Sequence, residues 1–439
     1  MIVSTRSSTL QTSTLAIAAF ALFSGAGATP LKRQGSSISW SQCPDHDETQ
    51  CAFFDVPRDY SNPDPNDTVS IFMRKLPANV SDENRLGSII TNPGGPGGSG
   101  SLFVALGGKK LSDITERRYD IIGFDSRAVN LTGPWTSCFD YEAKPLLLNF
   151  QQEYAGVPYP HGSLDQDRAV VDKLKSLQSG LSAACVANGN HKMLESSGTA
   201  FVVQDMARMV EALGEDGINF WGYSYGSILG ATFAAMRPDL VRRMLLDGVS
   251  NSESYYNDVL QWGRDGMAET YKTYTGFLST CADAGPELCA FAAPPGNSTK
   301  KQTTETLRKR MDALYARLGK QPQVVADSWV GPGIVTGSNV QALILGILYT
   351  PKAWRDTMQA LANLEKGNGT DVYNAIYSPI AAIDTLPYNQ NVFNRSMQRF
   401  PTRESLVPIA CGDTTPVNLS VNAYTDYIRE MDKISPVGG

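Results

Sequence analysis

The segment that most restricts the fold of this chain is Gly-Tyr-Ser-Tyr-Gly at residues 222–226, which matches the pattern G-x-S-x-G. It lies between an apolar segment with strand character, residues 218–221, and a helical apolar segment, residues 228–236, which Pro238 ends. In such a strand–turn–helix the small residues let the backbone pass through a tight turn, and the serine hydroxyl points out at the carboxyl end of a sheet. Ser224 is therefore the candidate nucleophile, and the helix N-terminus beneath it favours developing negative charge.

Segments with strand and helix periodicity alternate around this motif. Strand patterns occur at residues 69–73, 88–91, 119–125 and 244–247, and Val202, Met206, Met209 and Leu213 form one face of a helix that Gly214 ends. Strands that alternate with helices are typical of a mostly parallel sheet with helices on both faces. We therefore predict an α/β fold for residues 40–250.

The pattern changes after about residue 250. Leu307, Met311, Leu314 and Leu318 mark an amphipathic helix, residues 340–348 mark a second one, and residues 406–410 are the best remaining strand candidate. We predict that residues 251–439 form a mainly helical lid or cap, and that the last strands of the sheet are missing.

A glycine-rich loop follows the strand at residues 88–91. Its sequence at residues 92–100 is Asn-Pro-Gly-Gly-Pro-Gly-Gly-Ser-Gly. An acyl-transfer enzyme needs two backbone N–H groups aimed at the oxyanion, one from the residue after the nucleophile and one from a loop that approaches the substrate closely. Tyr225 and Gly95 are the candidate donors.

A dinucleotide site is the competing interpretation of the same loop. Residues 95–100 also match G-x-G-x-x-G, and Asp125 ends the next strand. Pro96 removes an N–H group close to where the pyrophosphate would lie, and this interpretation leaves residues 222–226 unexplained. We therefore expect no dinucleotide cofactor here.

Four segments together resemble the secreted tripeptidyl-aminopeptidase branch of the α/β-hydrolases, which is related to prolyl aminopeptidases. They are residues 51–63, 92–100, 119–125 and 221–226. The resemblance implies an α/β-hydrolase fold, a Ser-Asp-His triad, removal of short peptides from free N-termini, and no metal or cofactor. An esterase or lipase of the same fold is the alternative, because the sequence does not identify the acyl group.

The chain departs from this family near the third strand. The family often has Asp-Pro-Arg-Gly where residues 125–128 are Asp-Ser-Arg-Ala. The difference is expected to alter the loop beside the site.

Histidine is the larger departure. The three histidines, His46, His161 and His191, all precede Ser224, whereas this fold places the triad acid and then the histidine after the serine. Asp413 lies in a segment that resembles the acid loop of the family only superficially. Two hypotheses follow. In the first, the chain is C-terminally truncated and is an inactive, non-catalytic hydrolase-fold protein. In the second, His161 or His191 is recruited as the base from an unusual position.

The N-terminus predicts export. Residues 15–23 are apolar but too short to span a bilayer, and a small-x-small cleavage pattern at residues 26–28 follows, so residues 1–28 are predicted as a signal peptide. Seven sequons are compatible with a secreted glycoprotein; they lie at Asn66, Asn79, Asn130, Asn297, Asn368, Asn394 and Asn418.

The seven cysteines agree with an oxidising compartment. The simplest pairing, in sequence order, is Cys43–Cys51, Cys138–Cys185 and Cys281–Cys289, with Cys411 left over. The net charge of −6 gives no sign of nucleic-acid binding. The expected partner is a peptide or a small acyl substrate.

Overall fold

The computed structural model describes residues 38–136, 138–139, 143–158, 163–296, 300–385 and 402–438, so the predicted signal peptide at residues 1–28 lies outside the described residues. The chain divides into two compact units. The first comprises Met1–Thr136, His191–Val249 and Phe400–Asn418. The second comprises Ser137–Asn190, Ser250–Arg399 and Leu419–Gly439. Residues 137–190, inside the range expected for the core, thus group with the second unit.

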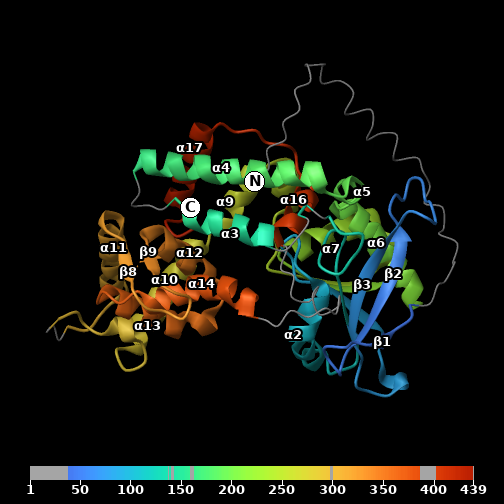
Figure 1. Ribbon diagram of the computed structural model, residues 1–439. Helices are drawn as coiled ribbons and strands as arrows, with labels where there is room; N and C mark the ends of the chain where they lie inside the picture. Colours follow the sequence, from blue (N-terminus) through green and yellow to red (C-terminus); the bar gives the residue numbers. More distant parts are fainter. Residues whose placement is uncertain are drawn as a thin grey trace. The chain divides into compact units, whose positions relative to one another are not determined.

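The first unit is built on a seven-stranded sheet with the order β1-β2-β3-β5-β4-β6-β7. The strands are β1 (Ser41–Gln42), β2 (Gln50–Pro57), β3 (Thr68–Leu76), β4 (Ser88–Asn92), β5 (Asp120–Phe124), β6 (Ile218–Tyr223) and β7 (Val241–Asp247). The pairs β5–β4, β4–β6 and β6–β7 are parallel, whereas β1, β2 and β3 add to the β5 edge in antiparallel fashion. The predicted α/β fold with a mostly parallel sheet is confirmed (Figure 1).

Helices cover both faces of this sheet, as predicted. On one face, Val104 and Leu111 of α2 (Gly100–Ile114) pack in one cluster with Ile89 and Ile121. On the other face, α7 (Tyr225–Met236) approaches Phe220 so closely that its Gly230 leaves no room for a side chain. α6 (Thr199–Leu213) packs beside α7. Alternation along β6 explains this division, because neighbouring strand residues point to opposite faces.

The strand register brings two loops together at one end of the sheet. Asn92, the last residue of β4, pairs with Gly222 of β6, and Tyr223 pairs with Asp247 of β7. The glycine-rich loop after β4 and the serine turn after β6 therefore leave the sheet side by side. Within the described part of the chain β7 pairs with β6 alone, and its Leu245 is 45% exposed.

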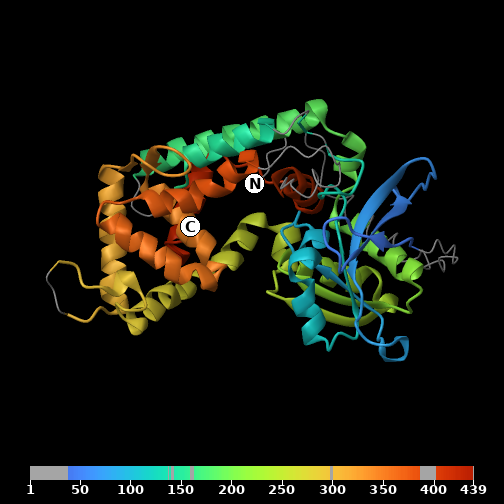
Figure 2. The same ribbon diagram turned by 60° about the horizontal axis from the view of Figure 1, so that its bottom comes forward.

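The second unit is mainly helical (Figure 2). Its helices are α3 (Ala143–Ala155), α4 (Leu164–Asn188), α8 (Ser252–Asn257), α9 (Val259–Met267), α10 (Thr270–Ala284), α11 (Thr304–Lys320), α12 (Gly337–Leu348), α13 (Trp354–Glu365), α14 (Thr370–Thr385) and α17 (Val421–Ile434). A two-stranded ribbon of β8 (Gln323–Val325) and β9 (Gly333–Val335) accompanies them. The buried core includes Phe277, Leu307, Met311, Ile344 and Leu361. The two predicted helices of this region correspond to α11 and α12.

The strand predicted at residues 406–410 is wrong. These residues lie inside helix α16 (Thr402–Asp413), which contains Pro408 and packs with α5 (His191–Glu195) and α6 in the first unit. A short apolar run cannot be assigned to a strand or a buried helix by periodicity alone, and here tertiary packing decides for the helix.

The three predicted disulfides are all present. Cys43–Cys51 joins β2 to the loop before it, Cys138–Cys185 ties the segment before α3 to α4, and Cys281–Cys289 closes a short loop after α10. Cys411 is a free, exposed thiol. No helix in the described ranges is long and apolar enough to cross a membrane.

Candidate active site

Ser224 occupies a strained backbone position between β6 and α7. Its φ of 54° and ψ of −121° lie outside the regions that side-chain-bearing residues usually adopt. It is the N-cap residue of α7, it is exposed, and its N–H donates to the backbone carbonyl of Asp247 over 3.0 Å. The turn therefore presents the serine side chain at the carboxyl end of the parallel strands.

The glycines on either side of Ser224 make this turn possible. A Cβ atom at Gly222 would lie 2.2 Å from the carbonyl oxygen of Gly226. A Cβ atom at Gly226 would lie 2.6 Å from the carbonyl oxygen of Asn92. Any side chain at either position would force the helix away from the sheet, so the two glycines of the motif follow from close packing.

The glycine-rich loop lies directly against Ser224. Gly94 has a φ of 95°, and a Cβ atom there would be 2.8 Å from the Cβ atom of Ser224 and 3.1 Å from the backbone nitrogen of Tyr225. Gly95, with a φ of 117°, follows immediately. The sequence singled out Gly95 and Tyr225 but missed Gly94, whose closeness to the serine depends on the sheet register.

Comparison with known protein families agrees with this fold. Residues 87–281 match the family described as the alpha/beta hydrolase fold. The chain carries an α/β-hydrolase domain.

The curated relatives of this chain include peptidases. The chain is 26% identical over 347 residues to the serine protease Hip1 of Mycobacterium tuberculosis. The aligned region covers 76% of this chain and 61% of that protein. It is also 31% identical over 233 residues to the tripeptidyl aminopeptidase of Streptomyces lividans. That aligned region covers 52% of this chain and 41% of the aminopeptidase. The chain thus spans less than two-thirds of the length of these curated relatives. Among solved structures, the proline iminopeptidase of Mycobacterium smegmatis aligns with a TM-score of 0.28 at 11% identity, covering 81% of this chain and 96% of that one.

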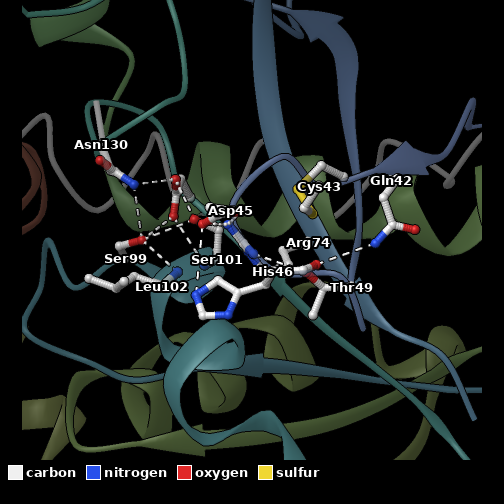
Figure 3. A network of polar contacts seen from close by, with 12 residues as sticks. Gln42, Cys43, Asp45, His46, Thr49, Arg74, Ser99, Ser101, Leu102 and Asn130 are labelled. Atoms are coloured by element: carbon white, nitrogen blue, oxygen red, sulfur yellow. Dashed lines mark hydrogen bonds and ion pairs between the residues drawn. A yellow bond between two sulfur atoms is a disulfide. The ribbon is translucent and has the colours of Figure 1, made fainter. Parts of the chain in front are cut away.

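A buried carboxylate anchors the end of the glycine-rich loop. Asp125 is fully buried, and it accepts hydrogen bonds from the Ser99 hydroxyl at 2.6 Å, from the Ser101 hydroxyl at 2.9 Å and from the Asn130 amide at 2.9 Å. Figure 3 shows Ser99, Ser101 and Asn130 converging on one point. Burial raises the pKa of Asp125, while the hydrogen bonds from Ser99 and Ser101 act in the opposite direction.

This network argues against a dinucleotide site and against a glycan on Asn130. A dinucleotide site would need the Asp125 carboxylate for a ribose hydroxyl, but protein donors already surround that carboxylate. Asn130 belongs to a sequon, but its side chain is buried in the network, so a glycan there is incompatible with this fold.

The residues after Asp125 form a second buried cluster. The Arg127 guanidinium contacts Asp205 of α6 at 2.8 Å, and the Tyr60 hydroxyl donates to the same carboxylate at 2.7 Å. Ala128 follows with a φ of 65°, in the left-handed region that favours glycine. The departure from the family pattern at residue 128 thus falls where glycine would be the least strained residue.

Tyr223 is the last residue of β6 and directly precedes Ser224. Its ring stacks on Trp221 with centroids 5.6 Å apart. Burial, followed by the nearby Asp247 carboxylate, raises the pKa of Tyr223 to about 12. The phenol therefore stays protonated at neutral pH. Asp247, which the sequence did not single out, lies beside Ser224 because β7 is the parallel neighbour of β6.

No hydrogen bond joins a described histidine to Ser224. His46 lies in the loop between β1 and β2, with Nε2 3.9 Å from Asp45, whose carboxylate pairs with the buried Arg74 (Figure 3). His191 is exposed at the start of α5, and His161 lies outside the described residues. The Asp413 carboxylate accepts hydrogen bonds from Thr199 at the start of α6.

Proposed function

We propose that this chain is an exported serine hydrolase of the aminopeptidase type, which releases short peptides from free N-termini through an acyl-enzyme on Ser224. The observation that carries the proposal is the strained, exposed Ser224 with the glycine-rich loop in contact with it. Relatives named serine protease and tripeptidyl aminopeptidase support the peptidase assignment. The three disulfides support passage through an oxidising compartment.

In the proposed reaction, Ser224 Oγ attacks the carbonyl carbon of the scissile peptide. A carbon–oxygen bond forms, and the carbonyl oxygen becomes an oxyanion that accepts hydrogen bonds from the N–H groups of Tyr225 and Gly95. The carbon–nitrogen bond breaks as the leaving amine takes up the proton that the serine hydroxyl gave up, and an acyl-enzyme remains. Water then attacks the acyl carbon, the ester bond to Ser224 breaks, and the short peptide leaves with a free carboxyl group while the serine hydroxyl regains a proton. A histidine base is the usual acceptor of the serine proton, and no described histidine bonds to Ser224.

Two observations favour alternatives. The chain is 27% identical over 363 residues to the carboxylesterase B of Mycobacterium tuberculosis. The aligned region covers 78% of this chain and 62% of that protein. This likeness favours an esterase that uses the same serine. The lack of a described imidazole bonded to Ser224 favours a hydrolase-fold protein that binds without cleaving.

One experiment separates the three functions. A fluorophosphonate probe is added to the full chain and to Ser224→Ala, and the wild type is assayed with tripeptidyl anilides and short-chain esters. Labelling that Ser224→Ala abolishes, together with anilide turnover, is the result expected for the peptidase. Labelling with turnover of esters alone identifies an esterase, and a wild type that is neither labelled nor active is the non-catalytic protein.

A further inference from the structure

Asp413 contacts α6 from a distant part of the sequence. It is the last residue of α16, and its Oδ1 accepts the backbone N–H of Thr199 at 2.7 Å while its Oδ2 accepts the Thr199 hydroxyl at 2.6 Å. Thr199 is the first residue of α6, and the N-cap residue Gly198 has no side chain to satisfy the helix. The carboxylate of one helix therefore caps another helix.

The Thr199 hydroxyl extends this contact to the serine turn. Its Oγ1 is also hydrogen-bonded to the hydroxyl of Tyr225, the residue that follows Ser224. Both Thr199 and Tyr225 are buried, with exposed fractions of 0% and 3%.

The donors in this chain of hydrogen bonds have one consistent order. An ionised carboxylate only accepts hydrogen bonds, so the single proton of the Thr199 hydroxyl is directed to Asp413. The Thr199 oxygen is then left to accept, and the Tyr225 hydroxyl donates to it. The carboxylate thus determines in which direction the tyrosine hydroxyl points.

We infer that Asp413 and Thr199 are positioning residues for the serine turn, acting through the hydroxyl of Tyr225. The inference rests on the proposed function, in which the Tyr225 N–H binds the oxyanion. Fixing both ends of Tyr225, its hydroxyl through Thr199 and its backbone through α7, fixes the direction of that N–H. A preorganised donor of this kind loses much of its effect when it is misplaced by about 1 Å.

Substitutions at Thr199 separate two contacts. One is the relay, by which we mean the hydrogen bonds from Tyr225 through the Thr199 hydroxyl to Asp413. The other is the cap, in which Asp413 accepts the backbone N–H of Thr199. Thr199→Val removes the hydroxyl but keeps the backbone N–H that Asp413 accepts, and Thr199→Ser keeps both groups. Asp413→Asn must keep an oxygen toward the backbone N–H, so its amide nitrogen faces Thr199 Oγ1 and reverses the order of donors. Asp113→Asn, at a surface carboxylate of the same unit that pairs with Arg117, is the matched control.

The test is the rate of fluorophosphonate labelling at Ser224 in the full chain, measured well below the melting temperature of each variant. We expect Thr199→Val and Asp413→Asn to slow labelling about 10- to 100-fold, and Thr199→Ser and Asp113→Asn to stay within about twofold of the wild type. Equal rates for Thr199→Val, Thr199→Ser and wild type would overturn the relay.

A wild type that is not labelled would contradict the proposed function instead. The relay is then decided by hydrogen–deuterium exchange in the peptide that contains Tyr225. Thr199→Val should raise exchange there while Thr199→Ser does not, and equal protection in both variants would show that the relay does not hold the turn.

Discussion

Gly94, in the loop after β4, contacts Ser224, in the turn after the parallel neighbouring strand β6. A methyl group at Gly94 would lie 2.8 Å from Ser224 Cβ and 2.5 Å from the carbonyl oxygen of Tyr223. The nearest obstacles are backbone atoms and a Cβ atom, which cannot rotate away. The approach of the glycine-rich loop to the serine therefore depends on the absence of a side chain at this one position.

Gly94→Ala is expected to destabilise the first unit and to slow labelling of Ser224 by at least about 10-fold, because both the clash and the φ of 95° oppose alanine. Labelling kinetics and thermal melting measure the two effects. Gly107→Ala is the matched control, since Gly107 lies in α2 with no neighbour within 4 Å of its would-be Cβ. That variant should keep the labelling rate and gain about 0.5–1 kcal/mol. Equal labelling of Gly94→Ala and wild type would contradict the contact.

Ala128→Gly should stabilise the protein. Ala128 has a φ of 65°, and an L-residue pays about 1–2 kcal/mol in the left-handed region, partly offset by the larger chain entropy of glycine in the unfolded state. We expect a net gain of up to about 1 kcal/mol in urea denaturation. Ala105→Gly, in the middle of α2, should instead lose about 1 kcal/mol. A loss of similar size in both variants would show that residue 128 is not strained.

Removing a disulfide should destabilise the protein more when the loop that it closes is longer, with a logarithmic dependence on loop length. Cys138–Cys185 spans 47 residues, whereas Cys43–Cys51 spans 8. The loop-entropy relation gives about 4 kcal/mol for the first and about 2.5 kcal/mol for the second. Chemical denaturation of the two double Cys→Ser variants checks which disulfide contributes more to the free energy of unfolding. In each variant, unfolding is followed in the unit that contains the removed disulfide. A larger loss at Cys43–Cys51 would contradict the entropic explanation.

Stability should depend on pH through Asp432. Burial first, and then the Asp167 carboxylate, raise the pKa of Asp432 to about 6, and its Oδ1 has no hydrogen-bond partner among the described residues. The folded state therefore binds a proton at higher pH than the unfolded chain does, so the free energy of unfolding falls as pH rises from about 4 to about 6 and stays lower above it. The side chain lies near the C-terminus of α17, where a negative charge is also unfavourable.

Asp432→Asn is expected to flatten this pH dependence and to stabilise the second unit at pH 7. The gain is up to about 1 kcal/mol, because solvent screens a partly buried group. Chemical denaturation between pH 4 and 8 is the measurement, and Asp426→Asn, at an exposed position of the same helix, is the control. An unchanged pH profile in Asp432→Asn would exclude this carboxyl as the titrating group.

The cysteines show which contacts are readable from the order of residues. Cys43–Cys51 and Cys281–Cys289 close short loops, and the in-order pairing also gave Cys138–Cys185 correctly. The serine turn belongs to the same class, because its strand, its two glycines and its helix are neighbours in sequence. Such local features follow from chain connectivity and steric limits alone.

Asp125 and Asp413 show where sequence reasoning ended. Pro96 already argued against a dinucleotide site, but the sequence did not reveal the partners of Asp125, and only the structure shows that it is buried against Ser99 and Ser101. Asp413 resembled a catalytic acid, but the packing of α16 on α6 directs it to Thr199.

What the sequence determined by itself is therefore the α/β alternation and the serine turn, since each depends on periodicity or on neighbouring residues. The disulfide pairing was the simplest of several that the cysteines allow, and the structure decided it. Only the tertiary structure decided that Gly94 touches Ser224, that residues 406–410 are helical and that residues 137–190 join the second unit. These depend on which distant surfaces bury one another, and that free energy is a property of the packed fold that no local pattern contains.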